Sequence, residues 1–96
     1  MIKVIVNQVT AGTLTNADGY SLKTRINDVL ASGDGVLLSF ENIITISSSF
    51  LNSSFGEIVD QFGLEILKDK IKITNYTPSL ASAIKKYFSD LKINTH

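Results

Sequence analysis

Three consecutive serines, Ser47, Ser48 and Ser49, are the residues of this chain whose type and position best suit chemistry. They stand between an apolar segment that predicts a strand and a periodic segment that predicts a helix. They should therefore lie at the helix start, where backbone N–H groups are unpaired and the helix dipole is positive. A hydroxyl there can cap the helix, bind an anion or accept a phosphoryl group. The residues alone leave these three roles open.

Residues that commonly carry catalysis or bind metals are scarce. His96 is the only histidine and stands in the short frayed, solvated tail that we expect from Ile93 to His96, and there is no cysteine. Ser-His-Asp catalysis and the usual zinc sites therefore lack their central members. Gly33-Asp34-Gly35 stands between a predicted helix and a predicted strand, the reverse of the order in dinucleotide-binding loops, so we interpret it as a turn. We expect no enzymatic activity, no metal and no cofactor.

Two charged residues are further candidates. Glu41 closes an apolar strand at the end where α/β sheets place their ligands, although most polar residues at strand ends bond to nearby backbone. Arg25 could bind an anion, but a single arginine without a basic cluster is more often an exposed helix residue.

The elements that would position these residues follow from the apolar pattern. Strands are predicted within residues 1–9, at Val36 to Phe40 and at Lys70 to Tyr76, with residues 12–14 as a candidate short edge strand. The first two main strands are apolar on both faces and should be interior, whereas the third alternates and should lie closer to an edge.

Three helices are predicted around these strands. The first begins near Thr15, with Asp18 completing a capping box, and ends at Gly33. The second follows the serines, and the third begins at Thr77-Pro78. Their apolar stripes and the strands should form one core, with members Leu38, Phe40, Leu51, Phe55, Ile58, Ile73, Ile84 and Phe88.

The second helix has an unusual middle. Its apolar stripe continues to Val59 and Phe62, but Ser53, Ser54 and Gly56 are small. Small residues lower helix propensity and allow another backbone to approach closely, so we expect a tight contact there.

Composition limits the class of protein. The 96 residues suffice for one domain with a single core. Nine basic residues balance nine acidic ones, which argues against nucleic acid and acidic membranes as partners. No apolar run reaches the roughly 18 to 20 residues of a membrane helix, and no leader sequence is evident. We expect a soluble cytoplasmic protein with an α/β fold, in which a small mixed sheet of about four strands carries three helices.

The segment from Leu37 to Leu51 resembles the strand, loop and helix start of STAS domains, which occur in bacterial anti-sigma-factor antagonists and at the cytoplasmic end of sulfate transporters. It is closer still to the STAS-like domains of unknown function in bacteria and prophages, whose motif is similar to Ile46-Ser47-Ser48-Ser49-Phe50 here. Phe55-Gly56, Gly63 and residues 72–75 also look like that family, so the resemblance runs from about Leu22 to Leu91.

The resemblance implies a single STAS-like domain over residues 1–96 that acts as a switch or adaptor without catalysis of its own. In the antagonists, a serine at this helix start is phosphorylated by a partner kinase with the histidine-kinase-like ATPase fold, and phosphorylation breaks the complex. Ser48 matches that serine, so Ser48, Ser47 and Ser49 are the phosphorylation candidates. The sequence differs from the antagonist pattern at Ser47, where an aspartate is usual, and at Phe50, where a glycine is usual.

The expected partner is accordingly a protein, an ATPase of the histidine-kinase-like type. It would bind a rim that includes Glu41, Asn42, Thr45 and Asn52, together with the exposed side of the second helix. The alternative is a sensor that binds a small anion or nucleotide at the same helix start.

Overall fold

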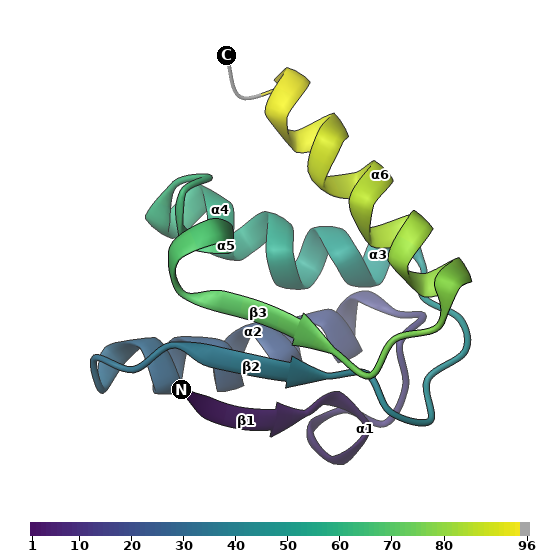
Figure 1. The fold of residues 1–96 in the computed structure, drawn as a ribbon, viewed down its shortest axis with the longest axis horizontal. Helices are drawn as coiled ribbons and strands as arrows, with labels where there is room; N and C mark the ends of the chain where they lie inside the picture. Colours follow the sequence, from purple (N-terminus) through teal and green to yellow (C-terminus); the bar gives the residue numbers. More distant parts are fainter. Residues whose placement is uncertain (95–96) are drawn as a thin grey trace.

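Three parallel strands form the sheet of the computed structural model, which describes residues 1–94 and the side chains up to Leu91 (Figure 1). The strands are β1 (Ile2–Ile5), β2 (Val36–Ser39) and β3 (Ile71–Thr74), and their order across the sheet is β1-β2-β3. Ile2 pairs with Val36, which pairs with Ile71. Parallel strands cannot be joined by hairpins, so each connection must be a crossover.

Helices make both crossovers and complete the chain. They are α1 (Val6–Val9), α2 (Asn16–Ala31), α3 (Ser48–Leu51), the π-helical turn η1 (Asn52–Gly56), α4 (Glu57–Phe62), α5 (Ile66–Asp69) and α6 (Pro78–Asn94). The segments α3, η1 and α4 follow one another without a break and correspond to the predicted second helix. Among the described residues, no helix combines the length and hydrophobicity needed to cross a bilayer.

Local signals placed the helix boundaries correctly. The Thr15 hydroxyl accepts a hydrogen bond from the Asp18 backbone N–H (3.1 Å), and the Thr77 hydroxyl accepts one from Leu80 N–H (3.1 Å). Gly33 has φ 88°, the left-handed conformation expected after a helix end. The frayed tail predicted from Ile93 onward is wrong at Ile93 and Asn94, which belong to α6, and its last two residues, His96 included, lie outside the described residues.

The predicted sheet needs several corrections. It has three strands rather than four, and all are parallel rather than mixed. Residues 12–14 form a loop because the Thr13 hydroxyl donates to the Thr45 carbonyl in a second loop. The first strand ends at Ile5 because α1 begins at Val6, where the Thr10 N–H donates to the Val6 carbonyl (3.1 Å). This strand also lies at an edge of the sheet and not in its interior. The central position of β2 and the edge position of β3 are confirmed.

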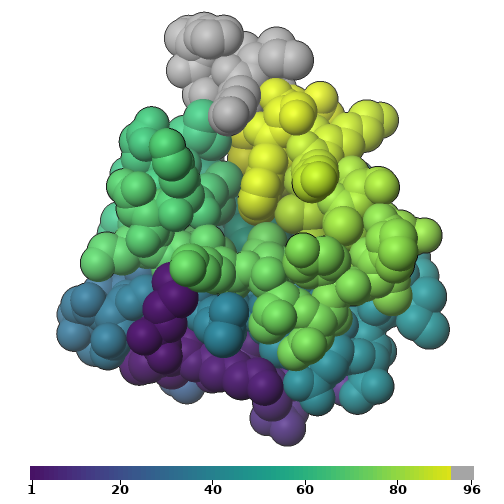
Figure 2. Space-filling view, viewed as in Figure 1, coloured from purple at the N-terminus to yellow at the C-terminus, as the bar shows by residue number. Residues whose placement is uncertain are grey.

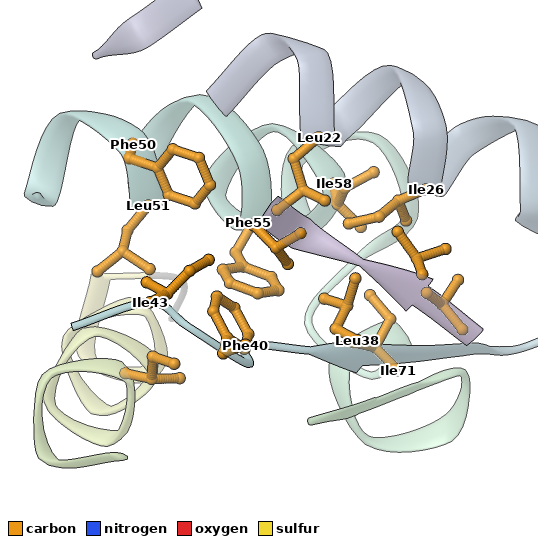
Figure 3. Packing of buried hydrophobic residues seen from close by; sticks show 14 of the residues in the cluster. Leu22, Ile26, Leu38, Phe40, Ile43, Phe50, Leu51, Phe55, Ile58 and Ile71 are labelled. Atoms are coloured by element: carbon orange, nitrogen blue, oxygen red, sulfur yellow. The ribbon is translucent and has the colours of Figure 1, made fainter. Parts of the chain in front are cut away.

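The core lies between the sheet and the long helices (Figure 3). Phe55 is fully buried and meets Phe88 of α6 edge to face, with ring centroids 5.3 Å apart. All eight predicted core residues belong to this cluster or pack against it. Phe62, however, is 45% exposed as the last residue of α4, whereas Phe50, which was not assigned to the apolar stripe, is fully buried.

The tight contact expected at the small residues occurs between α2 and the π-helical turn. A Cβ added to Gly19 of α2 would lie 2.5 Å from the Ser53 Cβ and 2.7 Å from the Phe50 carbonyl oxygen. Gly56 faces a different neighbour, because a Cβ there would lie 2.6 Å from the Tyr87 hydroxyl. The helices therefore meet closely at Ser53, and Gly56 makes room for a tyrosine.

Candidate functional site

Ser47 is the cap of the helix that begins with α3. Its backbone is extended, and its hydroxyl accepts a hydrogen bond from Phe50 N–H (3.0 Å). The same hydroxyl donates to the Leu14 carbonyl (2.9 Å), and Ser47 N–H donates to the Thr13 carbonyl (3.0 Å). Ser47 thus joins the helix start to the loop that follows α1, and its hydroxyl has a structural role.

Ser48 and Ser49 differ from Ser47 because both are exposed. Neither hydroxyl forms a hydrogen bond with any residue that the structure describes. As the first two residues of the helix, they also have backbone N–H groups without an intrahelical acceptor. Of the three serines, Ser48 and Ser49 are therefore the ones accessible to an enzyme or a partner.

A groove of about 480 Å³ lies beside this helix start, at the carboxyl ends of β1 and β2. Its walls are the loop after α1 and the loop after β2, and the lining residues are Asn7, Thr10, Gly12, Thr13, Leu14, Thr15, Asp18, Asn42, Ile43, Ile44 and Thr45. Ile44 is 79% exposed and Leu14 is 57% exposed. Two large apolar side chains are thus exposed to solvent at the edge of the groove.

The charge of this groove does not suit an anion. Asp18 is the single ionisable residue of the lining, which includes neither lysine nor arginine. Arg25, the candidate anion ligand, is an exposed residue of α2 and is not part of the lining. The described residues also contain no cluster of three or more histidine, cysteine or acidic side chains that could hold a metal ion.

Asn42 and Thr45, two of the predicted rim residues, lie in this groove. Asn42 has φ 63°, a left-handed conformation that asparagine tolerates better than most residues. This turn begins the loop that carries Ile43 into the core and leaves Ile44 exposed.

Glu41, another predicted rim residue, does not line the groove. Its carboxylate accepts a hydrogen bond from the buried Ser39 hydroxyl (3.0 Å) and lies 3.9 Å from the Lys3 ammonium. The Ser39 oxygen in turn accepts a hydrogen bond from the Asn75 amide (2.9 Å). Glu41 therefore joins a polar network across the ends of the three strands.

Asn52, the last predicted rim residue, lies one helical turn beyond the serines and is bound within the domain. The Tyr87 hydroxyl of α6 donates to its side-chain oxygen (2.8 Å). Burial raises the pKa of Tyr87, and the nearby carboxylates of Asp60 and Glu57 raise it further. Asn52 is thus partly engaged by α6, although it remains exposed.

The structure therefore gathers only part of the predicted site. Asn42, Thr45, Ser48 and Ser49 lie at or beside the groove, while Glu41 and Asn52 lie apart from it. The sequence-based reasoning missed Leu14 and Ile44. The available signal was weak: each is a large apolar residue in a segment without helical or strand periodicity.

The comparison with known families concerns this same region. A family model described as STAS-like domain of unknown function (DUF4325) matches residues 18–81, which include β2, the serines and β3. The chain belongs to this STAS-like family. No curated protein and no solved structure matches it significantly.

The resemblance to the antagonists implies two departures in this STAS-like domain, and the structure shows a role for each of the two residues. Ser47, where the resemblance implies an aspartate, acts as the helix cap, a role that serine and aspartate share. Phe50, where it implies a glycine, fills the core. Neither change covers the Ser48 side chain, which stays exposed.

Proposed function

We propose that this STAS-like domain is a non-catalytic regulatory module that binds a protein partner through the groove beside Ser48. The observation that carries the proposal is the exposure of Leu14 and Ile44 on the two sides of one groove. Exposed apolar residues that gather in one place, with polar residues around them, are typical of protein-binding surfaces.

The serines support regulation at this surface. Ser48 is exposed, is free of side-chain hydrogen bonds to the described residues, and follows the groove-lining loop after three residues. A phosphate on Ser48 would add about 1.5 to 2 negative charges beside unpaired backbone N–H groups. The fold would tolerate this charge, whereas a partner seated on Ile44 would meet it directly.

The partner in this proposal is a cytoplasmic ATPase of the histidine-kinase-like type that acts in trans. This part rests on the family resemblance, since the antagonists that resemble this domain work with such kinases. An anion or nucleotide sensor is the less favoured role, because the groove has an aspartate and lacks basic residues.

The test uses a purified ATPase of the histidine-kinase-like fold as the binding partner. Ile44→Asp should weaken binding by at least about tenfold, because it places a charge within the proposed apolar contact. Phe62→Asp is the matched control, since Phe62 is also exposed and apolar but lies at the end of α4. It should leave the dissociation constant unchanged.

Regulation is tested with the same pair of proteins and ATP. Mass spectrometry should find one phosphate on Ser48, and Ser48→Asp should weaken binding while Ser79→Asp, at the exposed start of α6, should not. Equal binding by wild type, Ile44→Asp and Ser48→Asp would refute the proposed surface. Binding that responds to Ile44→Asp without any phosphate on Ser47, Ser48 or Ser49 would leave an unswitched adaptor.

A further inference from the structure

The sheet has one face that no helix covers. In Figure 1, α2 lies behind the sheet and no helix crosses in front of it. Figure 2, drawn from the same side, shows the purple atoms of β1, the blue atoms of β2 and the green atoms of β3 at the surface. Parallel sheets are nearly always covered on both faces, so an uncovered face is unusual.

The strand register defines what this face presents. Lys3 of β1 is paired with Leu37 of β2, and Leu37 is paired with Lys72 of β3. The neighbours of Leu37 along its strand, Val36 and Leu38, are buried in the core. Because side chains alternate along a strand, Leu37 and the two lysines point to the uncovered face.

The spacing of this row matches the width of a helix. Adjacent strands lie about 4.8 Å apart, so the backbones of Lys3 and Lys72 are separated by about 10 Å. A helix with its side chains is about 10 to 12 Å in diameter. A helix laid along β2 would rest on Leu37 and have one lysine on each flank.

The charge of the face selects the kind of helix. Glu41 is the acidic residue that contacts this row, through Lys3, and the two lysines outnumber it. Lys72 is exposed and forms no ion pair with any residue that the structure describes. A second copy of the chain would bring the same excess of positive charge to the contact, which disfavours self-association through this face.

We propose that the uncovered face of the sheet, centred on the Lys3, Leu37 and Lys72 row, binds an amphipathic helix of a protein partner that has acidic residues on both sides of its apolar stripe. This surface is separate from the groove of the proposed function, because none of its three residues lines that groove. A single helix resting on this three-residue row would bury less surface than a standard interface, so the complex should be weak and transient.

A synthetic helical peptide with a leucine stripe flanked by glutamates is the probe, and the same peptide with lysine for each glutamate is its control. Titration into the labelled protein, followed by NMR, should shift the amide signals of β1, β2 and β3. The double variant Lys3→Glu/Lys72→Glu should raise the dissociation constant of the glutamate-flanked peptide by at least about tenfold, and it should gain affinity for the lysine-flanked peptide. Lys85→Glu/Lys86→Glu, an equal change of charge on exposed residues of α6, should have less than about a twofold effect.

Three outcomes would overturn the proposal. One is the absence of peptide binding up to about 1 mM, beyond the range of even weak specific interfaces. Another is an equal effect of the two charge-reversing double variants on peptide affinity, or amide shifts confined to the loops after α1 and β2 that line the groove. Either result would mean that the sheet face is not the binding site. The third is sedimentation with vesicles of phosphatidylserine and phosphatidylcholine that depends on Lys3 and Lys72, without peptide binding, because it would assign the face to a membrane surface.

Discussion

Replacing Gly19 with alanine tests whether the fold depends on the close contact between α2 and the π-helical turn. The added Cβ would lie 2.5 Å from the Ser53 Cβ, whereas carbon atoms in ordinary contact are about 3.5 to 4.0 Å apart. The two helices would have to separate by about 1 Å, because neither Ser53 Cβ nor the Phe50 carbonyl is a flexible side-chain end. Overpacking usually costs about 1 to 3 kcal/mol, and a clash with two groups that cannot turn away belongs to the upper part of that range, about 2 to 3 kcal/mol; the helix preference of alanine over glycine offsets about 1 kcal/mol. We expect Gly19→Ala to lower the free energy of unfolding by about 1 to 2 kcal/mol.

Urea denaturation followed by circular dichroism measures this change, and the melting temperature should fall by about 5 to 15 °C. Gly56→Ala is the matched control, since its nearest obstacle is the Tyr87 hydroxyl, the end of a side chain that can turn away. The lost hydrogen bond to Asn52 and the gained helix preference should nearly cancel, so that stability changes by less than about 0.5 kcal/mol. If Gly19→Ala were as stable as the wild type, the close contact would not limit the packing of α2.

Two further predictions concern the helix start and the tyrosine of α6. Ser47→Ala should lower the free energy of unfolding by about 1 kcal/mol through loss of the cap, whereas Ser48→Ala should change it by less than about 0.5 kcal/mol; equal losses in urea denaturation would contradict the assignment of Ser47 as the cap. The pKa of Tyr87 is raised in the folded protein above the ordinary 10.0, so its contribution to stability is complete below that pH and is lost as the pH rises through the folded pKa. Tyr87→Phe should remove the loss of stability that the ionisation of Tyr87 causes at high pH. The melting temperatures of the two proteins, compared from pH 8 to 11, would reveal this difference.

Local signals made much of the fold predictable. The helix starts at Thr15 and Thr77 and the helix end at Gly33 depend on side-chain or backbone geometry within a few residues, so the sequence identified them. The continuous apolar run of β2 likewise predicted a central strand, because apolar residues on both faces of a strand favour an interior position in the sheet.

The errors arose where distant contacts decide the structure. The sequence of residues 12–14 is compatible with a strand. The hydrogen bond from the Thr13 hydroxyl to the Thr45 carbonyl, which holds these residues in a loop, joins two positions that are far apart in the chain. The burial of Phe50 depends on the approach of α2 and on the π-helical turn, in which the Ser54 hydroxyl donates to the Phe50 carbonyl (2.7 Å). A regular helical period does not describe such a turn.

The candidate site was predictable in the same uneven way. The sequence located the serines at a helix start, and the cap at Ser47 is confirmed. It did not indicate that Leu14 and Ile44 would line one groove, because the two loops meet only in the folded domain. Nor could it align Lys3, Leu37 and Lys72, since strand register is a property of the assembled sheet.

The all-parallel sheet also sets the order in which this domain can be built. Both strand pairings join consecutive strands, but each pair is parallel and is connected by a long crossover, so no hairpin can form early and guide the rest. During synthesis, β2 can pair with β1 only after α2 has emerged, and its other edge stays unpaired until β3 leaves the ribosome. For that interval the apolar strand β2 has an open edge, which makes the partly synthesised chain the form most exposed to misassembly and to chaperone capture.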